Sequence, residues 1–140
     1  MLKKNQLIRQ KIHNSFLIKT AQFVGEDEFP IIKREDSIPN RIITFSKILE
    51  TKDFNQWVCF YENDEKFIRL WNNPKKYIKV LKKFNGIISS DFSLFWDMPL
   101  EWQRFYCFMG RCLSYWFIEN GIKVIPNIRY GSRKSKSFLH

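Results

Sequence analysis

The chain has 140 residues, which suffices for one domain with a substantial core. Hydrophobic residues make up 44% of it, Phe alone occupies 14 positions, and Gly and Pro occur only 5 times each, which excludes a disordered, collagen-like or low-complexity chain. No apolar run approaches the roughly 18 residues of a membrane-spanning helix, and the basic start has no apolar signal-peptide region behind it. We therefore expect a single cytoplasmic domain over residues 1–140, with no membrane partner.

The formal net charge is +10, and it is concentrated in the second half of the chain. Residues 1–70 hold 12 Lys plus Arg against 10 Asp plus Glu, whereas residues 71–140 hold 12 against 4. Such a field attracts nucleic acid, acidic protein surfaces or anionic lipid, although it also serves simply to keep an aromatic-rich protein in solution.

The N-terminal third shows only weak structural signals. In residues 1–24, Ile8, Ile12 and Phe16 have helical spacing among basic residues, which indicates either a short amphipathic helix or an arm. From Gly25 to Pro39, acidic and turn-forming residues predict irregular chain with a short strand at residues 31–32. We expect regular structure to begin in earnest after residue 53.

The central segment predicts a strand followed by helices. Residues 56–61 are a dense aromatic and β-branched run, typical of a strand buried on both faces. Asn63 or Asp64 is placed to cap the segment over residues 65–71, and Asn73-Pro74 predicts the start of a second helix. This helix should end at Asn85-Gly86 in the left-handed conformation.

The C-terminal half continues the alternation of strands and helices. An apolar strand opens at Gly86, the longest helix is predicted over residues 98–119 with an end at Asn120-Gly121, and another strand covers residues 122–128. This order predicts an α/β fold with a small, mainly parallel sheet built from right-handed crossovers. Residues 132–140 form a basic tail.

Three cysteines carry little sign of chemistry. They are Cys59, Cys107 and Cys112, an odd number without a CxxC spacing. The chain has only two histidines, at positions 13 and 140. Five residues on a helix separate the last two by about 140°, so they are not expected to share a metal. We expect reduced thiols, no metal and no cofactor. Because the chain has no glycine-rich phosphate loop, HExxH or GxSxG motif, the sequence favours a non-enzymatic protein, and an enzyme stays the alternative.

A candidate ligand site lies at the predicted carboxyl ends of the strands, where parallel sheets commonly bind ligands. If the strands are neighbours, polar side chains meet at one rim: Ser90, Asp91, Asn127 and Arg129. A carboxylate and a guanidinium there could hold a metal, a phosphate or merely each other. Alternatively, Asp91 only binds backbone of the following loop.

A second candidate site is basic. At about 100° per residue, five lysines of the helix after Pro74 fall on one side, opposite an apolar face. On the longest helix, Arg104 and Arg111 are two turns apart and could clamp a phosphate or an acidic side chain, or form a solvated edge. The residues predicted to bind nucleic acid or a protein partner are Lys75, Lys76, Lys79, Lys82, Lys83, Arg104, Arg111, Arg129, Arg133, Lys134 and Lys136.

Aromatic residues provide a further hypothesis. Trp71, Tyr130 and Phe138 could stack on unpaired bases, although core packing explains most aromatic residues in such a chain. On the longest helix, an apolar flank is wider than a helix covering one sheet face requires, which leaves a patch for a partner: Trp102, Phe108 and Tyr115.

Three segments, IRLWNNPKKY, FNGIISSDFSLFWDMPLEWQ and ENGIKVIPNIRYG, together resemble the family called domain of unknown function 4417, found in phages, mobile elements and their bacterial hosts. The likeness covers about residues 23–138. It implies an α/β domain of mobile-element origin and no assigned activity. The residues that match the family pattern are Trp71, Asn72, Asn73, Pro74, Asp91, Phe92, Ser93, Asp97, Met98, Pro99, Gln103, Arg111, Gly121, Pro126, Asn127 and Arg129.

Two departures from that family shape the functional hypothesis. Family members are longer after the segment matching residues 129–131, so this chain resembles a truncated version of a larger α/β domain. Members carry polar residues where this chain has Tyr106 and Met109. Both departures favour a non-enzymatic basic protein that binds a nucleoprotein or nucleic acid. Its most concrete form is an anti-CRISPR type inhibitor of a host defence nuclease, with a CRISPR effector as partner.

Two alternatives stay open. One is an enzyme or nucleotide-binding domain that uses Asp91, Asn127 and Arg129 at the strand rim. The other is an inert structural or oligomerising module. The sequence leaves the oligomeric state and the identity of any target undetermined.

Overall fold

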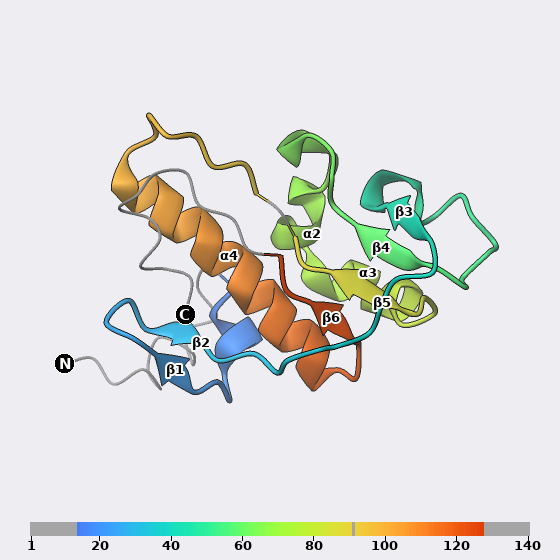
Figure 1. The fold of residues 1–140 in the computed structure, drawn as a ribbon, viewed down its shortest axis with the longest axis horizontal. Helices are drawn as coiled ribbons and strands as arrows, with labels where there is room; N and C mark the ends of the chain where they lie inside the picture. Colours follow the sequence, from blue (N-terminus) through green and yellow to red (C-terminus); the bar gives the residue numbers. More distant parts are fainter. Residues whose placement is uncertain (1–13, 91, 128–140) are drawn as a thin grey trace.

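The computed structural model describes residues 14–90 and 92–127. Its centre is a parallel sheet of four strands that follow one another in sequence order (Figure 1). The strands are β3 (Ile42–Thr44), β4 (Trp57–Cys59), β5 (Gly86–Ile88) and β6 (Val124–Ile125). The predicted α/β fold with a small, mainly parallel sheet is therefore confirmed.

The remaining elements connect these strands or precede them. A two-stranded antiparallel hairpin, β1 (Phe23–Val24) and β2 (Phe29–Pro30), precedes the sheet. The helical elements are the 3-10 turns η1 (Ser15–Ile18), η2 (Phe45–Lys47) and η3 (Asp64–Lys66) and the helices α2 (Ile68–Asn72), α3 (Pro74–Leu81) and α4 (Leu100–Glu119). Within the described part of the chain, no helix has the length and apolarity to cross a membrane.

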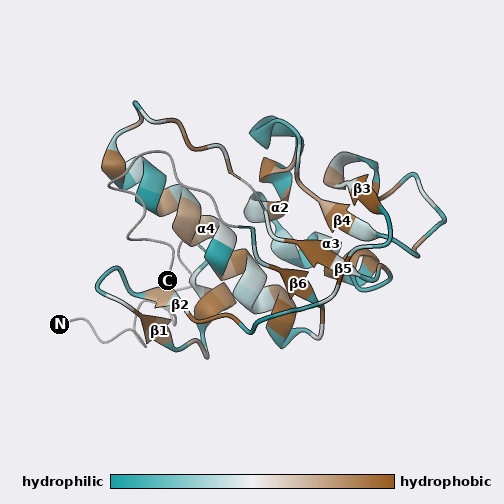
Figure 2. Ribbon diagram, in the orientation of Figure 1, coloured by the Kyte–Doolittle hydropathy of each residue, from teal (hydrophilic) through white to brown (hydrophobic). Residues whose placement is uncertain are grey.

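One face of the sheet packs into the main core. Strand register places Val58, Ile87 and Val124 side by side, and all three belong to the same buried cluster as Leu81 of α3 and Leu113 of α4. β4 and β5 are buried along their whole length, which is why they are apolar runs rather than alternating strands. Figure 2 shows the strands of this sheet as mainly hydrophobic, whereas α4 alternates between hydrophilic and hydrophobic residues.

A row of aromatic rings joins the sheet to the helices. Phe45, after β3, lies 5.1 Å from Tyr77 of α3 and 5.4 Å from Phe60, measured between ring centroids. Phe60 meets the edge of Phe67 at 5.3 Å, and Phe67 lies 5.1 Å from Phe92 in the loop before α4. All five rings are buried, so the abundant Phe of this chain is used largely for core packing.

The N-terminal predictions need correction. Regular structure begins before residue 53, because the β1–β2 hairpin and β3 precede it, and residues 31–32 are extended chain rather than a strand. The three strands that the sequence did not reveal are two or three residues long, too short for a period to show. Of the predicted N-terminal helix, the described part contains only the turn η1; residues 1–13 lie outside the described residues.

The predicted helix ends are partly wrong. Neither Asn63 nor Asp64 caps a helix with its side chain, and Gly86 does not adopt the left-handed conformation. Gly86 instead opens β5, opposite Trp57 of β4, where a Cβ atom would lie only 2.3 Å from the indole ring. The predicted end of the longest helix at Asn120-Gly121 is confirmed, and there Gly121 adopts the left-handed conformation with φ of +84°.

Other boundaries are shorter than predicted. The helix expected over residues 98–119 begins at residue 100, and the strand expected over residues 122–128 covers only residues 124–125. Pro126 follows β6 directly and cannot donate a further ladder hydrogen bond.

Candidate nucleic-acid interface

The exposed side of α3 carries the candidate basic face. Tyr77 and Leu81 turn toward the core and are buried, as helical periodicity predicts. The opposite side, which we call the lysine face, consists of exposed residues on α3 and on the hydrogen-bonded turn that extends it: Lys75, Lys76, Lys79, Lys82 and Lys83. The sequence thus predicted the placement of these side chains correctly.

The lysine face has no internal charge compensation. Within residues 14–90 and 92–127, none of its five ammonium groups forms an ion pair. Three of them instead lie over aromatic rings: the Nζ atom of Lys75 is 4.6 Å from the ring centroid of Phe16, that of Lys76 is 5.6 Å from that of Tyr77, and that of Lys83 is 5.3 Å from that of Phe54. Such contacts hold the side chains in place while the charges stay in water.

The two arginines of α4, unlike the lysine face, contact another part of the protein. The Nε atom of Arg104 lies 3.2 Å from a carboxylate oxygen of Asp27, and Arg111 donates a 3.3 Å hydrogen bond to the carbonyl oxygen of Pro30. The guanidinium of Arg111 also lies 6.0 Å from the ring centroid of Phe29, and burial lowers its pKa. Both arginines therefore bind the β1–β2 hairpin to α4. This placement differs from the solvated edge that the sequence allowed.

The rim of the sheet is assembled only in part among the described residues. Ser93 donates its backbone N–H to both carboxylate oxygens of Asp64 and its hydroxyl to one of them, at 3.0 Å each. The backbone N–H of Asn127 donates to the hydroxyl of Ser89 at 2.7 Å. Ser90 lies beside Gly110 of α4. The first set of hydrogen bonds joins the chain after β4 to the chain after β5, and the second joins the end of β5 to the chain after β6.

Several predicted site residues cannot be placed. Asp91, together with the basic residues Arg129, Arg133, Lys134 and Lys136, lies outside the described residues, as do Tyr130 and Phe138. The predicted rim site and the contribution of the C-terminal basic residues therefore stay predictions.

The carboxylate of Asp64 should contribute measurably to stability. Asp64→Ala removes the acceptor of three hydrogen bonds from Ser93, and we expect it to lower the free energy of unfolding by about 2 kcal/mol. Asp64→Asn keeps one acceptor oxygen and should cost less. Urea denaturation followed by circular dichroism measures both; equal stability of Asp64→Ala and the wild-type protein would contradict this role.

The cysteines are poor nucleophiles in their surroundings. Burial raises the pKa of Cys107 to about 11 and also raises the pKa values of Cys59 and Cys112. All three thiols are free. Among the described residues, no group of three His, Cys, Asp or Glu side chains is arranged to hold a metal ion.

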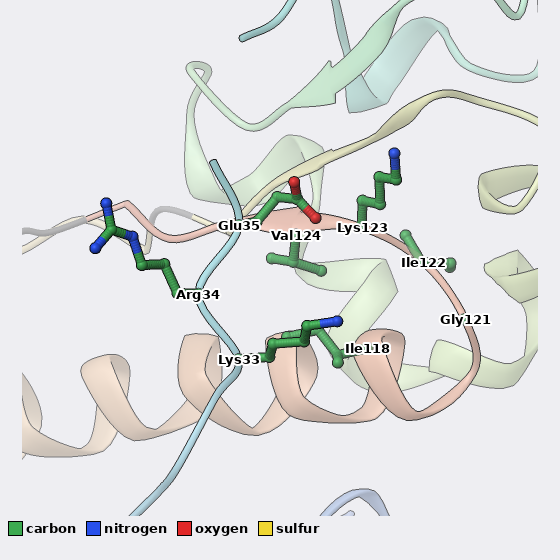
Figure 3. A pocket seen from close by; sticks show the side chains of 8 residues that line it. All are labelled: Lys33, Arg34, Glu35, Ile118, Gly121, Ile122, Lys123 and Val124. Carbon is green, nitrogen blue, oxygen red and sulfur yellow. The ribbon is translucent and has the colours of Figure 1, made fainter. Parts of the chain in front are cut away.

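A small pocket is lined by none of the predicted site residues, and no sequence signal marked it. It has a volume of about 160 Å³ and lies between the extended chain after β2 and the turn that joins α4 to β6 (Figure 3). Hydrogen bonds from Ser37 lower the pKa of the Glu35 carboxyl group, and Lys123 acts in the same direction. The lining residues are Lys33, Arg34, Glu35, Ile118, Gly121, Ile122, Lys123 and Val124.

The wide apolar flank predicted for α4 is only partly exposed. Trp102 is 53% exposed, whereas Phe108 packs against Phe29 of the hairpin at 5.7 Å between ring centroids. The hydroxyl of Tyr115 shares a 2.8 Å hydrogen bond with that of Thr20. The hairpin and the N-terminal segment therefore cover much of the flank and leave its first turns open.

The fold and the lysine face together define a small α/β protein with a parallel sheet and a basic helical surface. The chain belongs to the family described as domain of unknown function (DUF4417), whose model matches residues 21–140. It is also similar to the gene 1 protein of Mycobacterium phage L5, with 34% identity over 68 residues, which are 48% of this chain and 29% of that protein. The protein is thus a member of a phage-associated family, and it spans less than a third of this relative. No solved structure matches the chain.

Proposed function

We propose that this protein is a non-enzymatic nucleic-acid-binding protein that acts on nucleic acid or on a nucleoprotein complex through the lysine face. One observation carries the proposal: five ammonium groups share one exposed helix surface, and no carboxylate of the described residues neutralises them. A surface that only served solubility would be expected to intersperse both signs of charge.

A row of phosphates is the chemical complement of such a surface. Each phosphate that a lysine neutralises releases condensed counterions, which favours binding at low salt and makes the affinity depend steeply on salt concentration. The rings of Phe16 and Phe54 support this use of the face, because they order the side chains of Lys75 and Lys83 before any ligand arrives. Nucleic acid offers the required charge density regardless of its sequence.

The most concrete form of the proposal is an inhibitor of a host defence nuclease of the anti-CRISPR type. The similarity to a protein of Mycobacterium phage L5 supports a phage context for the chain. The lysine face would then occupy nucleic acid that a CRISPR effector must bind, and so compete with guide or target. Inhibition of this kind needs no reaction centre in the inhibitor.

Charge reversal tests the proposal. Changing all five residues of the lysine face to Glu should weaken binding to a labelled DNA oligonucleotide by about 100-fold at low salt, because attraction becomes repulsion. It should also remove most of the salt dependence, which amounts to a slope of about −0.7 to −0.9 per neutralised phosphate. Fluorescence anisotropy measures both quantities, and cleavage by a purified guide-loaded CRISPR effector measures inhibition.

A matched control variant separates the face from the net charge. Five other lysines are exposed and lie on different elements, and their reversal to Glu changes the net charge equally: Lys19, Lys33, Lys47, Lys52 and Lys66. We expect this variant to keep most of the affinity. Equal loss of affinity in both variants would assign binding to overall charge. Binding that is unchanged after reversal of the lysine face would refute the proposal.

A further inference from the structure

Aromatic side chains stay exposed on the first turns of α4 although the core is already rich in them. Trp102 is 53% exposed and Phe105 is 42% exposed. Their rings contact one another through Tyr106, with centroids 5.9 Å and 6.4 Å apart, and Phe105 meets the edge of Trp71 in α2 at 6.4 Å. We call Trp71, Trp102, Phe105 and Tyr106 the aromatic patch. These contacts hold the exposed rings in defined positions.

The aromatic patch adjoins the lysine face at the junction of α2 and α3. Trp71 lies in the last turn of α2, and α3 begins at Pro74, one residue before the first lysine of the face. The side-chain amide of Asn14 donates a 2.6 Å hydrogen bond to the carbonyl oxygen of Trp71, which ties this junction to η1. Phe16 of η1 lies under the Nζ atom of Lys75. One packed framework therefore carries both surfaces.

Beside the patch, one guanidinium group lies between two carboxylates. Glu101 is the acidic residue in the first turn of α4, and its carboxylate lies 3.3 Å from a guanidinium nitrogen of Arg104. Arg104 is held in turn by Asp27 of the hairpin. The carboxylate nearest in sequence to Trp102 is thus paired.

We propose that the aromatic patch and the lysine face together bind single-stranded nucleic acid, with phosphates along α3 and unpaired bases stacked on Trp102 and Phe105. This inference rests on the proposed function and specifies its substrate. Stacking requires bases whose faces are free, which a single strand provides and an intact duplex does not. A purely electrostatic surface would have no such preference.

A direct comparison of one oligothymidylate with its duplex tests the inference. We expect the single strand to bind at least about tenfold more tightly than the duplex, because only the single strand gains stacking energy. Binding should also quench tryptophan fluorescence. The double variant Trp102→Ala, Phe105→Ala should bind the single strand more weakly, by about 5- to 150-fold for each base that no longer stacks on a ring. Its affinity for the duplex should be unchanged.

Two further variants keep the test decisive. Trp102→Phe retains a stacking surface, so it should keep most of the affinity while losing part of the fluorescence quenching. Leu49→Ala removes an exposed apolar side chain that is 62% exposed in the connection from β3 to β4, and it should leave both ligands bound as before. Far-ultraviolet circular dichroism and urea midpoints show whether each variant is folded.

The possible outcomes separate the two proposals. Equal binding of the single strand and the duplex, or full single-strand affinity without the two aromatic side chains, overturns this inference and leaves the lysine face as the binding surface. Absence of binding to either form refutes the proposed function as well. A wild-type dimer in light scattering that dissociates in the Trp102→Ala, Phe105→Ala variant assigns the patch to a second copy of the chain and also overturns the inference.

Discussion

Phe60→Ala should lower the free energy of unfolding by about 4 kcal/mol, a large part of the total for a domain of this size. Phe60 follows β4 and is 1% exposed. Its ring stacks on Phe45 at 5.4 Å and meets the edge of Phe67 at 5.3 Å, so it is the central link in the row of buried rings. The substitution removes apolar burial, breaks both ring contacts and leaves a cavity. Urea denaturation followed by near-ultraviolet circular dichroism measures the change.

Two controls give this first prediction its specificity. Phe60→Leu roughly conserves volume and should cost less than about 1.5 kcal/mol. Phe95→Ala removes a ring that is 59% exposed, and it should change stability by less than about 0.5 kcal/mol. If Phe60→Ala were no more destabilising than Phe95→Ala, the row of rings would not hold the sheet and the helices together.

Gly86→Val should destabilise the protein by about 3 kcal/mol, the upper end of the usual cost of overpacking. Intrinsic strand propensity predicts the opposite sign, because Val is favoured in strands and Gly is not. The structure decides the matter: a Cβ atom at residue 86 would lie 2.3 Å from Cζ3 of Trp57, which is directly opposite in the neighbouring strand. Trp57 is buried and has little freedom to move aside.

A double-mutant cycle checks the cause of that effect. In a Trp57→Leu background the indole ring is absent, so Gly86→Val should become much less destabilising or even stabilising. Thermal and urea unfolding of the four proteins provide the coupling energy. Equal costs of Gly86→Val in both backgrounds would exclude the clash as its cause.

The functional proposals depend on how the helices are placed. Residues 74–84 bury Tyr77, Leu81 and Phe84 against the sheet, which leaves the lysine face in water. Arg104 and Arg111 are bound to the hairpin, so the groups of α4 that are accessible to a ligand are its exposed aromatic rings rather than these guanidinium groups. Exposed ammonium groups on α3 and exposed rings on α4 together suit a ligand that has both phosphates and exposed bases.

Part of the candidate site could be read from local sequence patterns. The lysine face follows from the period of about 3.6 residues in an amphipathic helix, which depends only on neighbours along the chain. The role of the arginines of α4 could not be predicted in this way. The contact between Arg111 and Pro30 joins residues that are 81 positions apart, and no local pattern records it.

The aromatic patch was predictable from the sequence only in part. The sequence singled out Trp71 and Trp102 as aromatic side chains available to a partner, but an aromatic-rich chain offers many such residues. Only the packed structure shows that Trp102 is exposed while Phe108 is covered by the hairpin. It also brings Phe105 of α4 against Trp71 of α2, which creates the patch from separate elements.

Local patterns in the chain suffice to predict β4, β5, α3 and α4, because apolar runs and helical periods depend only on neighbouring residues. The hairpin, the edge strand β3 and the roles of Asp64 and Gly86 depend instead on long-range packing. Each of these depends on a partner distant in sequence. β3 forms because it pairs with β4, and Asp64 accepts hydrogen bonds from Ser93 instead of capping the helix that follows it. Short elements that have little periodicity of their own acquire their structure from the surfaces against which they pack.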